Sequence, residues 1–255
     1  MIDIHSHILP GIDDGSPSME HTVELLKLAR ETGTEIIVAS PHSDNQYTYV
    51  PSRVDELIAE AQALAGDGIR IVRGCDFHLM TENILNALSQ PHNYTINRGP
   101  YVLMELSDMH IFPNTSQIWD QLEAAGMRII LTHPERNLIL QNKIEKIERW
   151  VEEGRYMQVT AQSLLGQFGQ HAQKVAFHLL DHGLCHFVAS DGHDIQGRPP
   201  RLDIVHRWLS ERYAPELAQL LLVDNPRAAV DGGPVEFEVP RFRRRTGLLG
   251  RLFGR

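Results

Sequence analysis

The sequence predicts an α/β fold, a seven-stranded (β/α) barrel in a single domain, and three observations favour it. Short apolar segments of strand length alternate with amphipathic helical segments along the chain. The strand segments are rich in Ile and Val and nearly continuous in apolar character, which is typical of parallel strands covered on both faces. Acidic or histidine side chains occur near the carboxyl ends of six of the seven strands. A barrel gathers such side chains from several strands on one face, whereas a doubly wound sheet concentrates them at one switch point.

The expected elements follow from these patterns. Strands are expected at 1–5, 35–40, 69–77, 101–106, 128–133, 156–161 and 186–190. Helices are expected within 18–33, 52–68, 115–126, 143–154, 163–183, 200–213 and 215–225. The first helix has a plausible cap at Ser18 and ends at Gly33, whereas Gly166 and Gly169 weaken the beginning of the fifth. No low-complexity linker interrupts the alternation, so residues 1–235 are expected to form one domain and 236–255 a basic, flexible tail.

Composition excludes several classes of protein. The chain has 255 residues, 42% of them hydrophobic, which is enough for a substantial core. Its net charge of −9 argues against binding nucleic acid. Two cysteines without a CxxC motif give neither a disulfide framework nor a zinc ribbon. No signal peptide and no apolar run of about 18 residues are recognisable, so a cytoplasmic location is expected.

Nine side chains are candidate metal ligands. His5 and His7 are two residues apart at the end of one predicted strand, so their imidazoles point to the same side. A lone histidine at a strand end is more often a hydrogen-bonded structural residue, but nine ionisable groups at the same ends of successive strands are hard to explain by packing. Asp, Glu and His together suit Zn²⁺, Mn²⁺ or Fe²⁺, and nine ligands suggest two or three ions. The candidates are His5, His7, Asp14, His42, Asp76, Glu105, His133, Asp191 and His193.

Six ordered motifs give these residues a family context. DIHSHILPGIDDG, ASPH, RGCDFH, LMEL, LTHPERN and ASDGH together resemble the PHP (polymerase and histidinol phosphatase) family over roughly residues 1–230. Within it, the chain most resembles the bacterial manganese-dependent protein-tyrosine phosphatases of capsule and exopolysaccharide loci. The resemblance implies a distorted seven-stranded PHP barrel that holds two or three divalent ions, with Mn²⁺ favoured over Fe²⁺ or Zn²⁺.

The resemblance also implies a distribution of the ligands. His5, His7 and Asp191 would hold a first ion, and Asp76 would bridge to a second that Glu105 and His133 complete. Asp14, His42 and His193 would hold a third. The chain departs from the family pattern at Asp76, where Glu is more usual, and at Ser43, where relatives often have a further histidine. Asp13 is expected to orient the loop rather than to bind metal.

Two arginines close behind ligand motifs are candidate catalytic residues. Arg136 and Arg198 match arginines that the family uses for phosphate and catalysis, and a guanidinium pairs bidentately with phosphate oxygens. The alternative for both is a solvent-exposed loop arginine. Arg201, which lies nearby, is expected to be a surface residue at the start of a helix. His78 shares a strand face with Asp76 and is expected either to contact phosphate or to hydrogen-bond a ligand.

The predicted reaction is direct hydrolysis of phosphotyrosine by a metal-bound hydroxide. The family implies a partner, an autophosphorylating tyrosine kinase of polysaccharide export. The main alternative is a PHP phosphomonoesterase acting on a small molecule such as histidinol phosphate. An amidohydrolase is disfavoured because all four lysines lie on predicted helices, and a nuclease because of the negative charge. A cysteine-based phosphatase is excluded because its C-x5-R motif is absent. Thr81 and Asp191 occupy the positions, six residues after Cys75 and Cys185, where the arginine is needed.

The last segment differs in character from the rest of the chain. From Pro240 onward it carries six arginines and no acid, together with the apolar stretch LLGRLF. One interpretation is peripheral contact with an anionic membrane beside a membrane-bound partner. The other is a basic terminus without a role.

Overall fold

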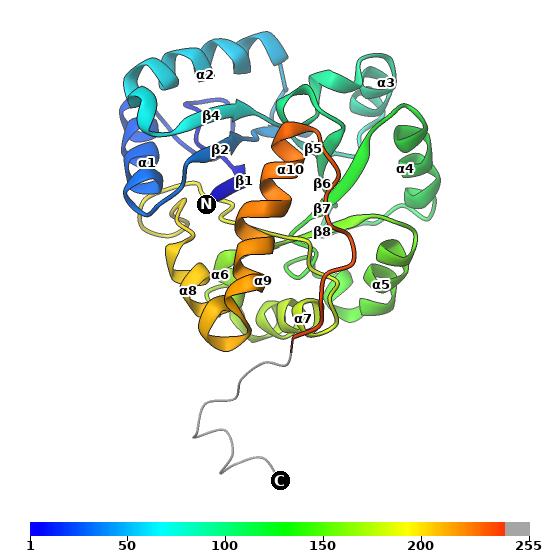
Figure 1. Cartoon of the computed structure of the whole chain (residues 1–255). Helices are drawn as coiled ribbons and strands as arrows, with labels where there is room; N and C mark the ends of the chain where they lie inside the picture. Colours follow the sequence, from blue (N-terminus) through cyan, green and yellow to red (C-terminus); the bar gives the residue numbers. More distant parts are fainter. Residues whose placement is uncertain (243–255) are drawn as a thin grey trace.

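The computed structural model describes residues 1–242, and the strands in this range are all parallel and form two sheets (Figure 1). The smaller sheet has the order β1–β2–β4, made of Ile2–Ser6, Ile36–Ala39 and Arg70–Arg73. The larger sheet has the order β3–β5–β6–β7–β8–β9. Its strands are His42–Ser43, Asp76–His78, Tyr101–Glu105, Arg128–Thr132, Tyr156–Thr160 and Phe187–Ala189.

One predicted strand is divided between the two sheets, and another is followed at once by a strand of the other sheet. The segment 35–40 ends as β2, and β3 follows across Pro41, which has no N–H to donate to a strand ladder. The segment 69–77 divides into β4 and β5 at Gly74, where a Cβ would lie 2.5 Å from Val38 Cγ1. Each of the seven predicted segments therefore contains strand. The segment 69–77 changes sheets at a bend, and β3 lies beyond the predicted segment 35–40.

The strands of residues 1–242 do not form a closed barrel. The edge strands β1 and β9 meet only at a single bridge between Ser6 and Gly192. Buried Asp3 joins this edge, because its carboxylate accepts hydrogen bonds from the Ser190 backbone N–H at 3.0 Å and from the Ser190 hydroxyl at 2.5 Å. The expectation of a seven-stranded barrel is thus met in its parallel α/β architecture but not in a continuous hydrogen-bonded ring.

Helices cover the outside of the sheets. They are α1 Met19–Glu31, α2 Pro51–Ala65, α3 Thr81–Ser89, α4 Thr115–Ala124, α5 Ile144–Glu152, α6 Ala161–Leu164, α7 Gly169–Asp181, α8 Asp203–Arg212, α9 Pro215–Gln219 and α10 Asn225–Asp231. The Ser18 cap is confirmed, since its hydroxyl accepts from the His21 backbone N–H at 3.3 Å. Helix α3 was not predicted. The predicted helix 163–183 is interrupted between α6 and α7, where Gly166 and Gly169 have φ of +85° and +86°.

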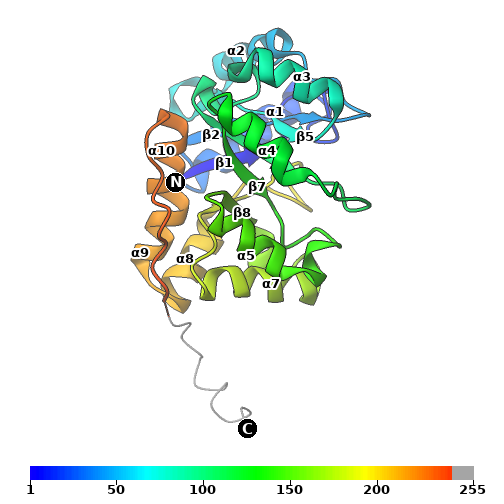
Figure 2. The ribbon, with the colours of Figure 1, turned by 90° about the vertical axis from the view of Figure 1, so that its right-hand side faces the viewer.

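The C-terminal part of the described chain lies over the amino ends of the strands (Figure 2). Ala229 and Val230 of α10 pack in one apolar cluster with Ile2, Ile4 and Tyr101. Beyond α10, Phe237 stacks on His186 with ring centroids 4.8 Å apart, and Val239 is buried. The first residues of the predicted tail therefore contact the globular body, while 243–255 lie outside the described residues. No helix within residues 1–242 is long and apolar enough to cross a membrane.

Candidate metal centre

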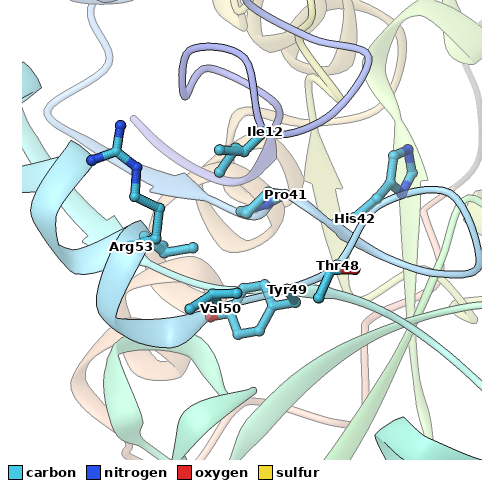
Figure 3. A pocket seen from close by; sticks show the side chains of 8 residues that line it. Ile12, Pro41, His42, Thr48, Tyr49, Val50 and Arg53 are labelled. Carbon is cyan, nitrogen blue, oxygen red and sulfur yellow. The ribbon is translucent and has the colours of Figure 1, made fainter.

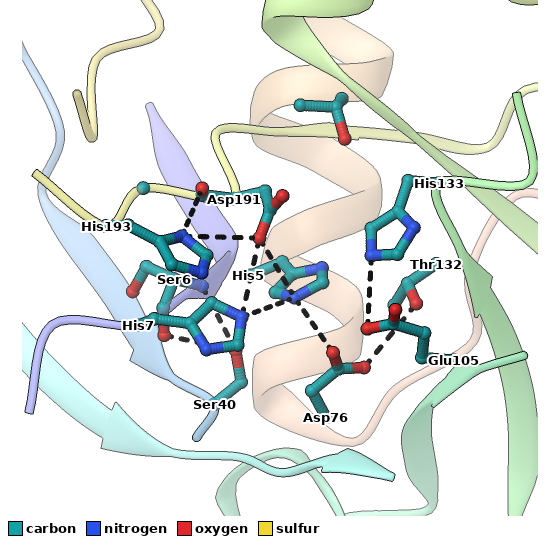
Figure 4. Close-up of polar contacts among 12 residues, drawn as sticks. His5, Ser6, His7, Ser40, Asp76, Glu105, Thr132, His133, Asp191 and His193 are labelled. Carbon is teal, nitrogen blue, oxygen red and sulfur yellow. Dashed lines mark hydrogen bonds and ion pairs between the residues drawn. The ribbon is translucent and has the colours of Figure 1, made fainter. Parts of the chain in front are cut away.

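The nine candidate ligands come together at the carboxyl ends of the strands. Figure 4 shows seven of them, all but Asp14 and His42. Histidine and carboxylate atoms form four overlapping groups, in each of which the ligand atoms lie within 4.8 Å of one another. The groups are His7–Asp14–His42–His193, His42–Asp76–His78–Glu105, His5–His7–Asp76 and His5–His133–Asp191. They contain every candidate ligand and also His78.

The first strand presents its two histidines as a pair. His5 Nε2 and His7 Nε2 are 3.1 Å apart, so both rings point to the same side as expected. His5 Nδ1 is 2.9 Å from Gln158 Oε1, and His7 Nδ1 is 2.8 Å from Asp13 Oδ2. Because the Nδ1 atoms are engaged, the Nε2 atoms are left to face the centre.

Two further side chains, Asp13 and Gln158, orient the candidate ligands His7 and His5. Asp13 also accepts from the Gly15 backbone N–H at 3.0 Å, so it fixes both the loop and His7. Gln158 was missed by the sequence reasoning. It lies on β8, the one predicted strand without a candidate ligand, and is fully buried. The available signal was an amide in the middle of the otherwise apolar segment YMQVT.

Asp191 lies among the ligands implied for the first ion. Its Oδ1 is 3.6 Å from His5 Nε2 and 3.4 Å from His7 Nε2. Asp191 and His133 both adopt a left-handed backbone, with φ of +51° and +31°. Non-glycine residues adopt this conformation at a cost and hold it where the surroundings impose it, often at functional sites.

Asp14 lies between the histidines implied for the third ion. Its Oδ1 is 3.4 Å from His42 Nε2 and 3.4 Å from His193 Nε2. The His7 and His193 rings stack with centroids 4.1 Å apart, so His7 reaches this group as well as the first. The two acids of the first loop thus have separate positions, as expected.

Asp76 and Glu105 connect the remaining ligands. Asp76 Oδ2 is 3.6 Å from His5 Nε2 and 3.2 Å from His42 Nδ1, so this carboxylate touches two groups although it is shorter than Glu. Glu105 Oε2 is 3.4 Å from His133 Nε2 and 3.5 Å from His78 Nε2. His78 therefore lies within the cluster rather than beside it.

The carboxylates and histidines shift each other's ionisation. Burial disfavours a charged His5, but the neighbouring Asp76 and Asp191 carboxylates raise its pKa to about 9. Burial also opposes protonation of His42, yet the neighbouring Asp14 and Asp76 carboxylates raise its pKa to about 12. Burial would raise the pKa of Asp191, but hydrogen bonding by His7 and the charge of His5 hold it well below its usual range. These shifts show that the carboxylates favour positive charge at this centre, either on the imidazoles or on a bound cation.

The donor set fits divalent metal ions. Five buried polar atoms of the cluster have no hydrogen-bond partner within the described chain, and such atoms are costly unless something pairs with them. They are His42 Nδ1, Asp76 Oδ2, His78 Nε2, Glu105 Oε2 and His193 Nε2. Imidazole nitrogens mixed with carboxylate oxygens suit first-row transition metals.

The two predicted arginines reach the centre. Arg136 pairs with the Asp191 carboxylate, and its guanidinium carbon lies 4.3 Å from the centroid of the Phe168 ring. Arg198 Nη1 is 3.5 Å from Asp191 Oδ2. The Arg136 and Arg198 side chains are 23% and 25% exposed to solvent. Arg201 instead pairs with Asp203 at 2.8 Å, in agreement with its interpretation as a helix-start residue.

Two hollows adjoin the centre. A small, mostly apolar pocket of about 280 Å³ lies beside His42, between Ile12, Pro41 and Val50 (Figure 3). A larger polar pocket of about 590 Å³ lies beside Glu105, His133 and Arg136.

Both Cys75 and Cys185 are fully buried away from solvent, and burial raises the pKa of each thiol.

A parallel α/β fold with a cluster of histidines and carboxylates at the strand ends defines a metallohydrolase type of centre. The chain belongs to the capsular polysaccharide synthesis family CpsB/CapC, whose model matches residues 1–231. A relative from Staphylococcus aureus, named "Putative tyrosine-protein phosphatase CapC", is 33% identical over 204 residues, 78% of this chain and 79% of that protein. The tyrosine-protein phosphatase YwqE of Bacillus subtilis is 29% identical, over 98% of this chain and 99% of its own.

Solved structures show the same relationship. A structure from work on YwqE of Bacillus subtilis and CpsB of Streptococcus pneumoniae, described as unique metal-dependent tyrosine phosphatases, superposes with a TM-score of 0.86. It is 26% identical and covers 97% of this chain and 100% of that one. The lactonase Lmo2620 of Listeria monocytogenes, at 13% identity and a TM-score of 0.52, shares the fold alone.

Proposed function

We propose that this chain is a metal-dependent protein-tyrosine phosphatase. The observation that carries the proposal is a buried cluster of histidines and carboxylates with unpaired ligand atoms, adjoined by two half-buried arginines. Membership of the CpsB/CapC family and the names of its relatives support phosphotyrosine as the substrate. The two sheets together would then act as one open, distorted seven-segment barrel that presents the site.

The nine predicted ligands are proposed to hold two or three divalent ions, with Mn²⁺ first and Fe²⁺ or Zn²⁺ as alternatives. One ion would be held by His5, His7 and Asp191, a second by Glu105 and His133, and a third by Asp14, His42 and His193. Asp76, which touches His5 and His42, is proposed as the bridge between groups. When bound, such ions polarise the phosphoryl oxygens and lower the pKa of water to about 7.

The protein's own groups bind and orient the phosphoryl group. Arg136 and Arg198 both lie against Asp191, so their guanidinium N–H groups converge where equatorial phosphate oxygens would be neutralised. His78, whose buried Nε2 lies 3.5 Å from Glu105 Oε2 and makes no hydrogen bond within the described chain, is proposed to contact the phosphate. The leaving phenolate (pKa ~10) needs less protonation than an alkoxide, so no general acid is assigned.

A substrate panel tests the proposal. Mn²⁺-loaded protein is offered a phosphotyrosine peptide, a phosphoserine peptide and histidinol phosphate, and the release of phosphate is measured. We expect the phosphotyrosine peptide to be preferred. Preference for the alkyl phosphate would instead establish the small-molecule phosphomonoesterase. His5→Ala should lose both bound metal and activity, whereas His178→Ala, which changes a histidine on α7 paired with Glu148, should keep both.

The cellular context is part of the same proposal. A tyrosine kinase of polysaccharide export is the proposed phosphoprotein partner, and a cytoplasmic location near the membrane would bring the two together. Membrane contact through the basic terminus falls mainly on residues 243–255, which lie outside the described residues. Liposome binding by the full chain, and its loss on removal of residues 240–255, would test that prediction.

A further inference from the structure

Exposed apolar side chains gather on the loops that follow the carboxyl ends of the strands. Within residues 1–242, five of the large exposed hydrophobic side chains lie on such loops, and three lie on helices instead. The loop residues are Val50 (46% exposed), Met109 (87%), Phe112 (44%), Leu138 (59%) and Ile195 (42%). Single exposed apolar side chains are ordinary on protein surfaces, so only those that the structure holds together beside the site carry an argument.

Met109 and Leu138 belong to two loops that are tied together. The Leu138 backbone N–H donates to Asp108 Oδ1 at 3.2 Å. The Asn137 side chain donates to the carbonyl oxygens of Leu106 at 3.1 Å and Ser107 at 3.2 Å. The loops after β6 and β7 are therefore held as one unit, and we call Met109 and Leu138 the apolar ledge. In Figure 2 these green loops project on the side opposite α10.

The ledge is continuous with the metal centre. Asp108 and Asn137, the residues that precede Met109 and Leu138, line the polar pocket of about 590 Å³ together with Glu105, His133 and Arg136. A phosphate bound at Arg136 would place the rest of its carrier at the mouth of this pocket. A small phosphomonoester would end there, whereas a polypeptide would continue onto the ledge.

We propose that the apolar ledge is a docking surface for the polypeptide segment that carries the phosphotyrosine, and that it selects segments with an apolar side chain next to that residue. The inference rests on the proposed function and names its substrate class more closely. Two features favour this occupant: the arginines suit a phosphate dianion, and the exposed Met109 and Leu138 side chains beside the pocket suit an apolar neighbour of the phosphotyrosine. The ledge determines specificity and takes no part in the chemistry.

Two variants test the ledge. The double variant Met109→Ser/Leu138→Ser removes it, and Leu64→Ser/Leu85→Ser makes the same kind of change on α2 and α3, at side chains that are 57% and 63% exposed. Mn²⁺-loaded proteins are given para-nitrophenyl phosphate and two phosphotyrosine peptides, one flanked by leucines and one by serines. The ledge variant should raise KM for the leucine-flanked peptide about tenfold, as expected for losing an apolar anchor. Its turnover of para-nitrophenyl phosphate and of the serine-flanked peptide should match wild type, as should all activities of the control.

Several results would overturn the ledge. Wild-type protein that treats the two peptides alike has no such selectivity. Equal losses in both double variants would point to a general surface effect, and a loss on para-nitrophenyl phosphate would mean that the loops only support the site. Binding of the same peptides with a non-hydrolysable difluorophosphonate in place of phosphate, followed by fluorescence anisotropy, tests the ledge separately. Absence of turnover on every phosphotyrosine compound together with leucine-selective binding would refute the proposed function while retaining the ledge.

Discussion

The Gln158 side chain provides the sharpest test of how the metal centre is organised. His5 Nδ1–H donates to Gln158 Oε1 at 2.9 Å, and both side chains are fully buried. This bond sets the tautomer in which Nε2 is free to bind metal. Gln158→Leu removes the acceptor and keeps an apolar side chain of similar size. We expect the variant to fold and to bind Mn²⁺ more weakly.

The magnitude follows from the burial of the pair. Without Gln158, the His5 N–H has no water to replace its lost partner, and an unpaired buried donor costs about 1–3 kcal/mol. That cost can be avoided by adopting the other tautomer, which places the proton on Nε2 and blocks the metal. Either route weakens Mn²⁺ binding by about 10- to 100-fold, the range found when partners of metal ligands are removed.

Calorimetric titration of Mn²⁺ into metal-free protein measures this change directly. Gln158→Glu keeps an acceptor and should bind Mn²⁺ within a few-fold of wild type. Gln62→Leu is the control. The half-buried Gln62 side chain donates to the Ile69 carbonyl oxygen and accepts from the Ile71 backbone N–H, and it is not part of the metal centre. It should lower the free energy of unfolding but not the affinity for Mn²⁺. Wild-type affinity in Gln158→Leu, or equal weakening in both leucine variants, would refute the reasoning.

Three further predictions concern catalysis, pH and metal. Arg136→Ala should reduce kcat by about 10²- to 10³-fold, while the amount of bound Mn²⁺, measured by elemental analysis, stays at the wild-type level. The control Arg201→Ala should change neither quantity. Loss of metal from Arg136→Ala would assign Arg136 a structural role. Burial lowers the pKa of His186 to about 4 from an unfolded value near 6.5, so the unfolded chain binds the extra proton between these values and stability falls as the pH drops. Urea unfolding in the presence of a chelator should show that the free energy of unfolding falls by about 2 kcal/mol between pH 7 and pH 5 because of this group. The loss should be absent in His186→Asn, whose side chain can still accept from the Met157 backbone N–H. Equal losses in both proteins would contradict the assignment. Finally, chelation should abolish activity, and Mn²⁺ at 100 times its Kd should restore it and add about 2.7 kcal/mol to the free energy of unfolding, whereas an unchanged thermal midpoint would argue against a buried metal site.

The ligand positions could be predicted because a parallel strand fixes where its carboxyl end lies. His5, His7 and Asp191 each come at or just after a strand, so their convergence followed from recognising the strands. The roles of the two first-loop acids were also predictable from the resemblance, and the structure places Asp13 against His7 and Asp14 against His42 and His193.

Other features depended on contacts between distant segments. Nothing local marks Gln158 as a partner of His5, because the two are 153 residues apart in the chain. The change of sheet at Pro41 and at Gly74 depends on pairing between distant segments, because β2 pairs with β1 and β4 whereas β3 pairs with β5. The same holds for His78, whose approach to Glu105 is set by the pairing of β5 with β6.

The sequence by itself determined the alternation of strands and helices, the family, and the residues that can bind metal, because these depend on local periodicity and on residue chemistry. Only the tertiary structure decided that the strands form two sheets rather than a closed ring, which atoms of the histidines face the centre, and that Met109 and Leu138 lie beside it. Those outcomes depend on pairing and hydrogen bonding between residues far apart in the chain, which no local pattern encodes.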